Sequence, residues 1–308
     1  MTIYDTIGIN VFTYTIPSLL MGENMGNTVA QNDAVVLDPL LEKVHRDGGY
    51  DFREYKRGTV TRRLERRLHA TGAKTYLDYM EFLDAHPEEY QKLADDLTIK
   101  VSGFFRSPYT FQQVARLVLP ELISYKRNQG EPSLRLWSTA CARGEEPYSV
   151  AILLTEFLGN RLQDFNISVY ATDIDRQALE EAQAGIYSLK DIDGLPSAIL
   201  ESYFTRYDKG YMVRADIRQM LSFSYFDLTS TIHPFVDLDC IFCCNILIYL
   251  QEQLQERLLD MLYNSLATPG YLILGEVETP TNSLRGKLEC LDTKARIYRK
   301  IGGDGEDD

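Results

Sequence analysis

Residues 140–146, ACARGEE, follow an apolar run, LRLWST, and hold the side chains best placed for chemistry. The small residues at 140–142 let a ligand approach the backbone, and Gly144 permits a turn that other residues resist. Glu145 and Glu146 then stand where a helix should begin, which suits the helix dipole but would repel a diphosphate. A dinucleotide site would instead carry G-x-G-x-x-G before a free helix N-terminus. This turn is therefore not expected to hold a dinucleotide.

A ligand with no phosphate, with hydroxyl groups and with a positive charge would fit two carboxylates at this turn. S-adenosylmethionine has a ribose, a cationic sulfonium and a zwitterionic amino acid. The run ISVYATDI supports this ligand, because it brings in Asp173, whose carboxylate could accept hydrogen bonds from ribose hydroxyls. The alternative is that Glu145 and Glu146 only stabilise the first turn of a helix. The local pattern leaves both interpretations open.

Four short β-rich runs would position these residues: LRLWSTA, ISVYATDI, LDCIFCCN and GYLILGEV. Helical stretches lie between or after them, among them EEPYSVAILLTEFLG, DRQALEEAQAG and QEQLQERLLDMLYNSLA. Strands separated by helices predict a parallel sheet covered on both faces. In such a sheet ligands bind beyond the carboxyl ends of the strands, where ACARG and Asp173 would lie. Residues 203–223 break the alternation and predict a small antiparallel β insert.

The chain before this sheet has a helical pattern. Residues 34–112 are predicted to form an N-terminal helical domain, and residues 113–302 the α/β domain. Residues 1–33 predict a poorly ordered leader, and residues 303–308 a short acidic tail. One stretch of the helical domain, DFREYKRGTVTRRLERRL, places apolar residues near one face and arginines on the other. The apolar residues are Phe52, Tyr55, Val60, Leu64 and Leu68.

The composition is that of a globular protein with a substantial core, since 44% of the 308 residues are hydrophobic and 25% are charged. No stretch approaches the roughly 20 apolar residues of a membrane span. The five cysteines form no disulfide framework in a chain of this size, which predicts a reducing, cytoplasmic location. Cys240, Cys243 and Cys244 lie in an apolar run without a histidine cluster, so no metal site is expected.

The charge is unevenly distributed along the chain. A formal net charge of −13 disfavours generic binding to nucleic acid or to an anionic membrane. Residues 53–67 are nevertheless basic, and they include Arg62, Arg63, Arg66 and Arg67. A basic helix on an acidic protein favours an acidic partner. The alternative is a solvated helix face whose arginines pair with nearby acids.

Several segments together resemble the chemotaxis-receptor methyltransferase (CheR) family. They are DFREYKRGTVTRRLERRL, LTIKVSGFFRSPYTF, LRLWSTACARGEEPYSVAILL, YATDIDRQALEEAQAGIYS, DCIFCCNILIYL, PGYLILGEVETP and KARIYRK, in the family's order, over residues 48–301. The resemblance implies transfer of a methyl group from S-adenosylmethionine to glutamate side chains of receptor helices, giving methyl esters and S-adenosylhomocysteine. It also implies the fold class. This is α/β: a class I S-adenosylmethionine-dependent methyltransferase (Rossmann-like) sheet with an N-terminal all-α domain and a small antiparallel β insert.

The resemblance carries cofactor-binding roles over to individual positions of this chain. They are Lys100, Ser102, Arg106, Ala140, Glu145, Asp173, Asp227, Leu228, Cys244 and Asn245. Lys100 and Ser102 stand where the family usually has Asn and Thr, and Ala140 stands for a frequent Gly. Cys244 replaces a common Arg, and Gly275-Glu276-Val277-Glu278 replaces a Gly-His-Ser-Glu run. A guanidinium at Arg106 would suit the methionine carboxylate of the cofactor.

The expected chemistry needs no general base, because a glutamate substrate is already ionised at neutral pH. The acids beside the cofactor would bind it and take no proton. The implied partner is the acidic, Glu/Gln-rich helical bundle of a chemoreceptor, docked by Arg62, Arg63, Arg66 and Arg67. The insert between Arg206 and Arg214 is too compact for the loop that binds a tethering pentapeptide in some family members, so no tether is expected. The protein is expected to be a monomer without membrane insertion.

Other functions remain to be weighed against this one. An amino-directed nucleic-acid methyltransferase would carry an Asn- or Asp-Pro-Pro-aromatic run where this chain has Asn245-Ile246-Leu247-Ile248. A dehydrogenase is disfavoured by the repulsion between the paired glutamates and a diphosphate. A non-catalytic signalling module derived from the same family, which binds S-adenosylmethionine or S-adenosylhomocysteine, stays open. Cys244 and Glu276 would be its distinguishing residues.

Overall fold

A computed structural model describes residues 30–98, 102–130, 132–230 and 232–301, and of residues 30–35 the backbone alone. The described residues form two compact units. The smaller contains residues 30–98 together with Tyr249–Gln251, and the larger contains the rest. The sequence placed this division after residue 112, but Phe105 and Phe111 pack in the core of the larger unit. The predicted tail, 303–308, and residues 1–29 of the predicted leader lie outside the described residues.

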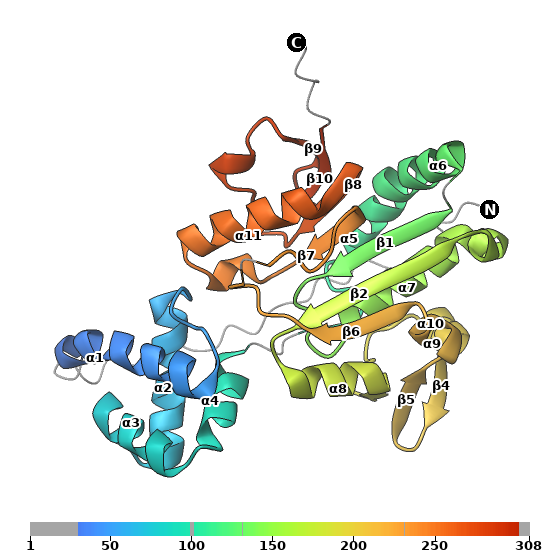
Figure 1. The fold of residues 1–308 in the computed structure, drawn as a ribbon. Coiled ribbons are helices and arrows are strands. Elements are labelled where there is room, and N and C mark those ends of the chain that lie inside the picture. The colour runs from blue at the N-terminus through green and yellow to red at the C-terminus, as the bar shows by residue number, and fades with distance from the viewer. Residues whose placement is uncertain (1–29, 99–101, 131, 231, 302–308) are drawn as a thin grey trace. The chain divides into compact units, whose positions relative to one another are not determined.

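The smaller unit is helical, as the sequence predicts. Its helices are α1 (Ala30–Lys43), α2 (Arg57–Thr71), α3 (Tyr76–Ala85) and α4 (Glu89–Leu97), with a π-helical turn η2 (Val44–Gly48) after α1 (Figure 1). Helix α3 begins at a capping box, in which Thr75 and Asp78 each bind the other's backbone amide. Of the predicted apolar face of the basic stretch, Phe52, Tyr55, Val60 and Leu64 are buried and Leu68 is half-buried. The amphipathic pattern thus packs this unit's core.

The larger unit is built on a seven-stranded sheet. Its strands are β1 (Ser133–Ser138), β2 (Asn166–Asp173), β6 (Leu221–Tyr225), β7 (Leu238–Cys243), β8 (Leu266–Leu274), β9 (Leu288–Asp292) and β10 (Ile297–Lys300), in the order β6-β2-β1-β7-β8-β10-β9 (Figure 1). The first five in that order pair in parallel, and β10 and β9 are antiparallel. All six residues of β7 are buried, as the centre of a covered parallel sheet requires.

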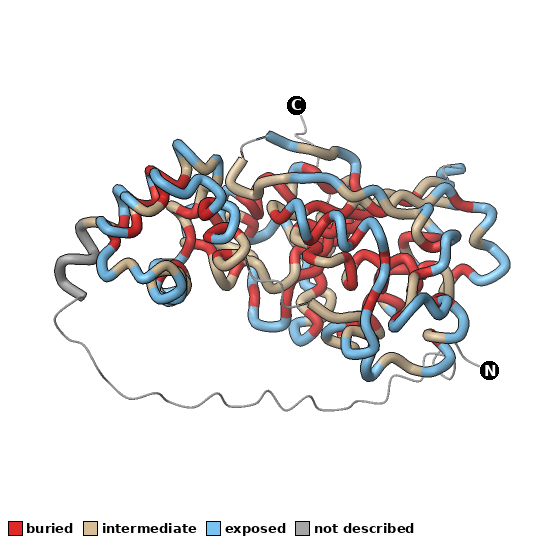
Figure 2. Tube along the Cα trace, turned by 90° about the horizontal axis from the view of Figure 1, so that it is seen from below, coloured by how far each residue is buried: buried red, intermediate tan, exposed pale blue. Residues whose placement is uncertain are grey.

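The helices of this unit precede or follow the strands, and some of them pack on the large sheet. They are α5 (Pro108–Gln113), α6 (Leu119–Gln129), α7 (Glu145–Leu158), α8 (Arg176–Ala184), α9 (Ser197–Tyr203), α10 (Ala215–Arg218) and α11 (Glu252–Ser265), with short helical turns η3 (Val114–Val118), η4 (Gly159–Asp164), η5 (Leu247–Tyr249) and η6 (Asn282–Leu284). Helix α7 contacts β1, β2 and β6, and α11 contacts β8. Ten of the 14 residues of α7 are buried, so the helix that begins with the paired glutamates lies in the interior of the unit. Figure 2 shows the buried residues gathered inside the trace, with exposed residues at its outside.

A second, three-stranded antiparallel sheet takes the order β3-β5-β4, from β3 (Ile186–Ser188), β5 (Gly210–Val213) and β4 (Phe204–Tyr207). The predicted antiparallel insert is therefore present. Its predicted span, 203–223, needs two corrections. Strand β3 comes from before the span, and residues from Leu221 onward pair in parallel with β2 in the large sheet. Only one strand flanks β6, so its side chains are mostly exposed and its sequence lacks the apolar run that marks the buried strands.

Candidate functional site

The loop between β1 and α7 is held in a fixed shape by the neighbouring strand. The Cys141 amide donates to the Thr172 carbonyl at 2.9 Å, and the Gly144 amide donates to the Cys141 carbonyl at 2.9 Å. Ala142 and Gly144 both have positive φ, 47° and 89°. A Cβ atom at Gly144 would lie 2.9 Å from the Cβ of Ala182, so glycine is required there for space as well as for conformation.

Asp173 closes this loop against the end of β2. Its Oδ2 accepts a hydrogen bond from the Ala142 amide at 2.8 Å, and its Oδ1 accepts one from the Asp175 amide at 2.9 Å. Burial raises the pKa of this carboxyl, and the backbone amides oppose that rise. Each carboxylate oxygen keeps further acceptor capacity. Asp173 can therefore fix the loop and still accept hydroxyl groups from a ligand.

Glu145 is the first residue of α7 and only 3% of it is exposed. Its Oε2 has no hydrogen-bond partner among the described residues. Burial raises the pKa of the carboxyl, opposed by its own backbone, the charge of Arg143 and a hydrogen bond from the Ser102 side chain. A buried carboxylate oxygen with no donor is costly unless something supplies one. This oxygen is suited to a ligand that carries hydroxyl or ammonium donors.

Glu146 has different surroundings. Its Oε1 accepts a hydrogen bond from the Ser138 hydroxyl at 2.7 Å, which ties the start of α7 to the end of β1. Burial raises the pKa of this carboxyl, while hydrogen bonds from Ser138 and Cys244 and the charge of Arg106 lower it. One interpretation of the sequence was that Glu146 stabilises the first turn of the helix. In the structure it secures the helix to the strand.

The Cys244 position, where the family usually has Arg, holds a neutral thiol. Its Sγ donates to the Ile273 carbonyl at 3.8 Å. Burial raises the pKa of the thiol well above its ordinary value, and the charges of Glu146 and Glu278 raise it further. A thiol with a raised pKa is protonated at neutral pH and is a poor nucleophile. Cys244 is therefore a neutral group close to two acids, Glu146 and Glu278.

Asn245 follows in a left-handed conformation, with φ of 61°. Its backbone amide donates to Oε2 of Glu278 at 2.8 Å, and the Gly275 amide donates to the same atom at 2.8 Å. The other oxygen, Oε1, accepts from the Ile248 amide at 3.3 Å. Glu278 is 3% exposed, whereas Glu276 is exposed. The sequence drew attention to Glu276, in place of a histidine, and missed the buried acid two residues later.

Several other positions taken from the family resemblance lie at or just after the carboxyl ends of parallel strands. Ala140 and Asp227 each come two residues after a parallel strand, as Asn245 does, and Asp173 ends one. Because these strands are parallel neighbours, their carboxyl ends share one edge of the sheet. Asp227 Oδ1 accepts from the Thr229 amide at 2.8 Å, and Leu228 is half-buried. Arg106 is exposed, and Lys100 lies outside the described residues.

Arg143, which the sequence did not single out, anchors the loop from the opposite side. Its guanidinium donates to both carboxylate oxygens of Asp191, at 3.1 and 2.9 Å. The Tyr187 hydroxyl donates to the Arg143 carbonyl at 2.7 Å. Bidentate pairing of this kind fixes orientation as well as adding energy. The loop that carries Glu145 is thus held by a strand, an aspartate and an arginine clamp.

The four arginines proposed for substrate docking lie on α2 in the smaller unit, and three of them have internal partners. Arg67 binds buried Glu89 at 2.6 Å, and Arg66 binds Asp96 at 2.7 Å. Arg63 donates to the Asp96 carbonyl. Arg62 is exposed and has no ion pair among the residues that the structure describes. Pairing with nearby acids, the alternative interpretation of the basic helix, therefore accounts for much of this charge.

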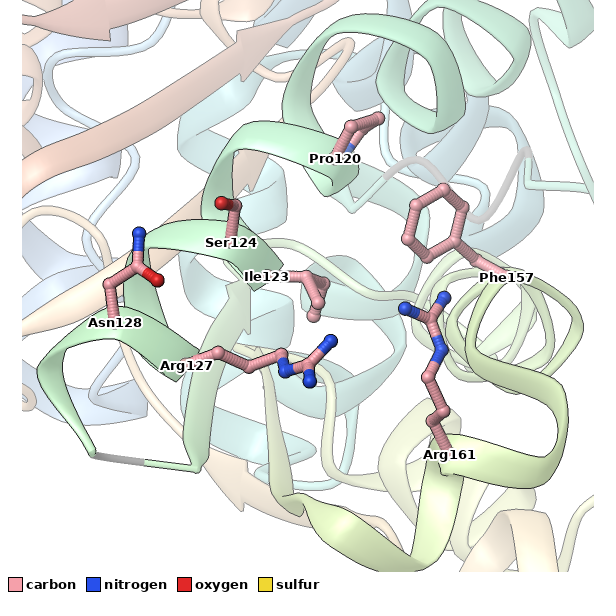
Figure 3. A pocket seen from close by; sticks show the side chains of 7 residues that line it. All are labelled: Pro120, Ile123, Ser124, Arg127, Asn128, Phe157 and Arg161. Atoms are coloured by element: carbon pink, nitrogen blue, oxygen red, sulfur yellow. The ribbon is translucent and has the colours of Figure 1, made fainter.

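A separate hollow of about 400 Å³ lies between α6 and the end of α7. Figure 3 shows the side chains of Arg127 and Arg161 reaching towards each other beside Ile123, with Phe157 above the Arg161 guanidinium. Arg127 precedes the start of β1 and Arg161 precedes the start of β2, so the hollow lies at the amino ends of the strands. None of the family-derived positions lines it. It is distinct from the strand-end site.

Among the described residues, no group of three or more His, Cys, Asp or Glu side chains could hold a metal ion. Within the same part of the chain, no helix is long and apolar enough to cross a membrane.

The strand order, with antiparallel β10 between β8 and the edge strand β9, defines a Rossmann-like α/β domain, with acids at the start of α7 and the end of β2. Residues 100–297 match the family model "CheR methyltransferase, SAM binding domain", and residues 37–98 match "CheR methyltransferase, all-alpha domain". The chain belongs to the CheR methyltransferase family, and S-adenosylmethionine is its cofactor. The family, fold class and cofactor predicted from the sequence are confirmed.

Relatives of this chain carry names that agree with the family. The chemotaxis protein methyltransferase of Borreliella burgdorferi is 30% identical over 268 residues, which cover 86% of this chain and 93% of that protein. The chemotaxis protein methyltransferase of Escherichia coli is 31% identical over 249 residues, covering 78% and 82%. An uncharacterised 104.1 kDa protein of Rhodobacter capsulatus is 31% identical over 268 residues, which cover 87% of this chain and 28% of that protein.

Proposed function

We propose that the protein transfers the methyl group of S-adenosylmethionine to glutamate carboxylates of chemoreceptor cytoplasmic helices, giving glutamate methyl esters and S-adenosylhomocysteine. The observation that carries the proposal is the buried Oε2 of Glu145, which lacks a hydrogen-bond donor among the described residues at the sheet edge where such cofactors bind. The relatives named as chemotaxis protein methyltransferases support the same activity.

The residues around this oxygen fit the groups of the cofactor. Glu145 and Asp173 would accept hydrogen bonds from its hydroxyl or amino groups, and Asp227 with Leu228 would flank the adenine. Arg106 would pair with the methionine carboxylate. The other proposed contacts are Lys100, Ser102, Ala140, Cys244 and Asn245.

The bound cofactor supplies a methyl group on a positively charged sulfur. The protein has to hold a substrate carboxylate in line with that methyl group and exclude water from it. A glutamate has an ordinary pKa near 4.3, so the substrate is ionised and no side chain must remove a proton. Asp173 accepts hydrogen bonds from two backbone amides, and Glu145 is buried at the start of α7. They are binding groups in this mechanism, and no residue acts as a general base.

The proposed substrate surface is an acidic, Glu/Gln-rich helical bundle. Arg62 is exposed and without an ion pair among the described residues, so it is the arginine of α2 best able to contact such a bundle. Arg66 is also exposed and could exchange its Asp96 partner for a receptor carboxylate. Arg63 and Arg67 would contribute positive charge to the same helix while keeping their contacts with Asp96 and Glu89. Charges at the rim of an interface mainly steer association and set register.

Substrate binding without a tethering peptide is part of the proposal. Strands β4 and β5 are joined by Asp208 and Lys209 alone, which leaves no extended loop between them. We propose that the enzyme acts as a monomer in the cytoplasm, without nucleic acid and without membrane insertion.

A non-catalytic module is the second candidate, and Cys244 favours it. The neutral thiol stands where the family resemblance implies an arginine, and the acids Glu146 and Glu278 lie close enough to raise its pKa. Such a protein would bind S-adenosylmethionine or its product and signal through a partner. It would share every cofactor contact with the enzyme, so binding and turnover must be measured separately.

The test is calorimetric titration of S-adenosylmethionine and S-adenosylhomocysteine, followed by a methylation assay on a chemoreceptor cytoplasmic fragment. Glu145→Gln and Arg106→Ala are expected to weaken both ligands at least tenfold, and the exposed Glu180→Gln on α8 is the matched control. Binding with turnover supports the enzyme. Binding without turnover supports the module, and no binding by folded protein contradicts both.

A further inference from the structure

We infer that Glu278 is a positioning residue for the cofactor site, and that it acts through Asn245. The inference rests on the proposed function, because Asn245 takes its cofactor-binding role from that proposal. Glu278 itself belongs to the loop after β8 and is 3% exposed, so its carboxylate contacts protein and not solvent.

The carboxylate of Glu278 gathers three backbone amides from two segments. Oε2 accepts from Asn245 and from Gly275, both at 2.8 Å, and Oε1 accepts from Ile248 at 3.3 Å. Asn245 and Ile248 follow β7, whereas Gly275 follows β8. An ionised carboxylate has acceptors on both oxygens and no donor, so it alone among side chains of this shape can satisfy all three. Glu278 therefore joins the ends of two adjacent parallel strands.

Gly275, Glu278 and Asn245 are packed tightly against one another. A Cβ atom at Gly275 would lie 2.6 Å from Oε2 of Glu278, 2.8 Å from the Asn245 amide nitrogen and 2.8 Å from Asn245 Nδ2. The Asn245 side chain thus passes over the glycine, in the space that a larger residue would fill. With φ of 61°, Asn245 lies in the left-handed region, which asparagine adopts more readily than most residues, and its amide is fixed there by Glu278.

The consequence concerns which way Asn245 faces. Without the Glu278 acceptor, the Asn245 backbone would be free to leave this conformation, which asparagine tolerates but does not require. Relaxation would turn the Asn245 side chain away from the strand ends, where the cofactor is proposed to bind. Glu278 then contributes to cofactor affinity without touching the cofactor. The nearby Glu276 is exposed, and its side chain has no hydrogen bond to any described residue, which makes it a matched control.

A double-mutant cycle on S-adenosylhomocysteine binding tests this inference by calorimetry. Glu278→Gln presents an amide group to at least one backbone N–H, so we expect about tenfold weaker binding, equivalent to about 1.4 kcal/mol. Asn245→Ala should weaken binding to a similar extent. The double variant should bind no more weakly than the weaker single variant, because Glu278 acts through Asn245. Glu276→Gln should bind as the unchanged protein does.

Other results would overturn the inference. Binding by folded Glu278→Gln within twofold of the unchanged protein would do so, and so would additive losses in the double variant. Amide hydrogen exchange on the unchanged protein gives a second test that needs no variant to fold. The Asn245 and Ile248 amides should exchange slowly, and rapid exchange would contradict the described hydrogen bonds. If the unchanged protein binds no cofactor, the proposed function fails. The exchange result would still test whether Glu278 holds the Asn245 and Ile248 amides.

Discussion

The carboxylate of Asp173 accepts a hydrogen bond from the backbone amide of Ala142 at 2.8 Å, so the end of β2 fixes the loop that follows β1. Its other oxygen is taken by the Asp175 amide at the start of α8. One side chain therefore sets the shape of two adjacent strand ends. A residue expected from the sequence only to bind ribose also builds the surface on which the ribose would lie.

Asp173→Asn should weaken both the fold and cofactor binding. An asparagine can accept from one of the two amides, and its own NH₂ group would face the other. An unmet buried donor costs about 1–3 kcal/mol, which corresponds to a melting temperature lower by several degrees. Thermal melts and S-adenosylhomocysteine titration measure the two effects. The exposed Asp164→Asn in η4 should change neither, and an unaltered melting temperature for Asp173→Asn would contradict the loop-fixing role.

Glu146→Gln should change how stability depends on pH. Burial raises the pKa of Glu146 in the folded protein above its value in the unfolded chain. The unfolded chain then loses its proton first as pH rises, so this group makes the fold progressively less stable between the unfolded and folded pKa values. Glutamine cannot titrate and keeps an acceptor for the Ser138 hydroxyl. The variant should therefore gain stability relative to the unchanged protein as pH rises.

Urea midpoints from about pH 4 to about pH 8 measure this difference. Glu180→Gln, an exposed acid on α8, controls for the loss of one surface charge. The prediction fails if the gap between the Glu146→Gln and unchanged midpoints is the same at every pH, because no coupled proton would then be involved.

The parts of this site that are local in sequence could be predicted, and the parts made by distant residues could not. ACARGEE carries its turn, its small residues and its helix start within seven positions, and the structure has the turn and the helix where expected. Glu278 reaches back 33 residues to the amide of Asn245, and nothing near Glu278 in the sequence marks that contact. Its local signals were its place after a strand and a glycine, and its match to the last residue of the family's Gly-His-Ser-Glu run.

The difference between local and distant contacts also explains which strands, and which contacts of the basic helix, could be predicted. The four strands found from sequence are apolar runs, whereas β6, LSFSY, is a mostly exposed edge strand recognised only through its pairing with β2. On α2, the period of the arginines showed that they share the polar side. It could not show that Arg67 would meet Glu89, because that contact requires α4 to pack against α2.

Arg67 and Arg62 should therefore differ sharply when each is replaced by alanine. Arg67 is 16% exposed and pairs with Glu89, which is 2% exposed and also accepts from the Tyr79 hydroxyl. Removing one partner of a buried pair costs about 3–5 kcal/mol, because the other charge stays buried. Arg67→Ala should lower the stability of the smaller unit, measured by denaturant unfolding. Arg62→Ala should leave that stability within about 0.5 kcal/mol.

The proposed docking role predicts that Arg62→Ala affects the methylation rate, although it hardly affects stability. Arg62→Ala should slow methylation of a receptor fragment several-fold at low salt and less at high salt, because screening already weakens the lost charge. Cofactor affinity should stay unchanged. If Arg62→Ala methylates the fragment at the normal rate at both salt concentrations, α2 is a solvated face with internal ion pairs and docks nothing.

Gly144→Ala should damage the site from the other end of the loop. Gly144 has φ of 89°, and a Cβ atom there would lie 2.9 Å from Ala182 Cβ and 3.3 Å from both Tyr148 and the Tyr187 hydroxyl. The conformation alone costs alanine about 1–2 kcal/mol, and crowding adds to it. Because Gly144 directly precedes Glu145, any shift also moves the carboxylate proposed to hold the cofactor.

Gly72→Ala separates these two contributions. Gly72 ends α2 with φ of 79°, and a Cβ atom there would meet nothing within 4 Å. It should therefore show the conformational cost alone, with no change in S-adenosylhomocysteine affinity. Gly144→Ala should be the less stable of the two in denaturant unfolding and should bind the ligand at least tenfold more weakly. Equal stability losses for the two variants, or unchanged binding by Gly144→Ala, would mean that the loop can move aside and that its fixed shape does not hold Glu145 in place.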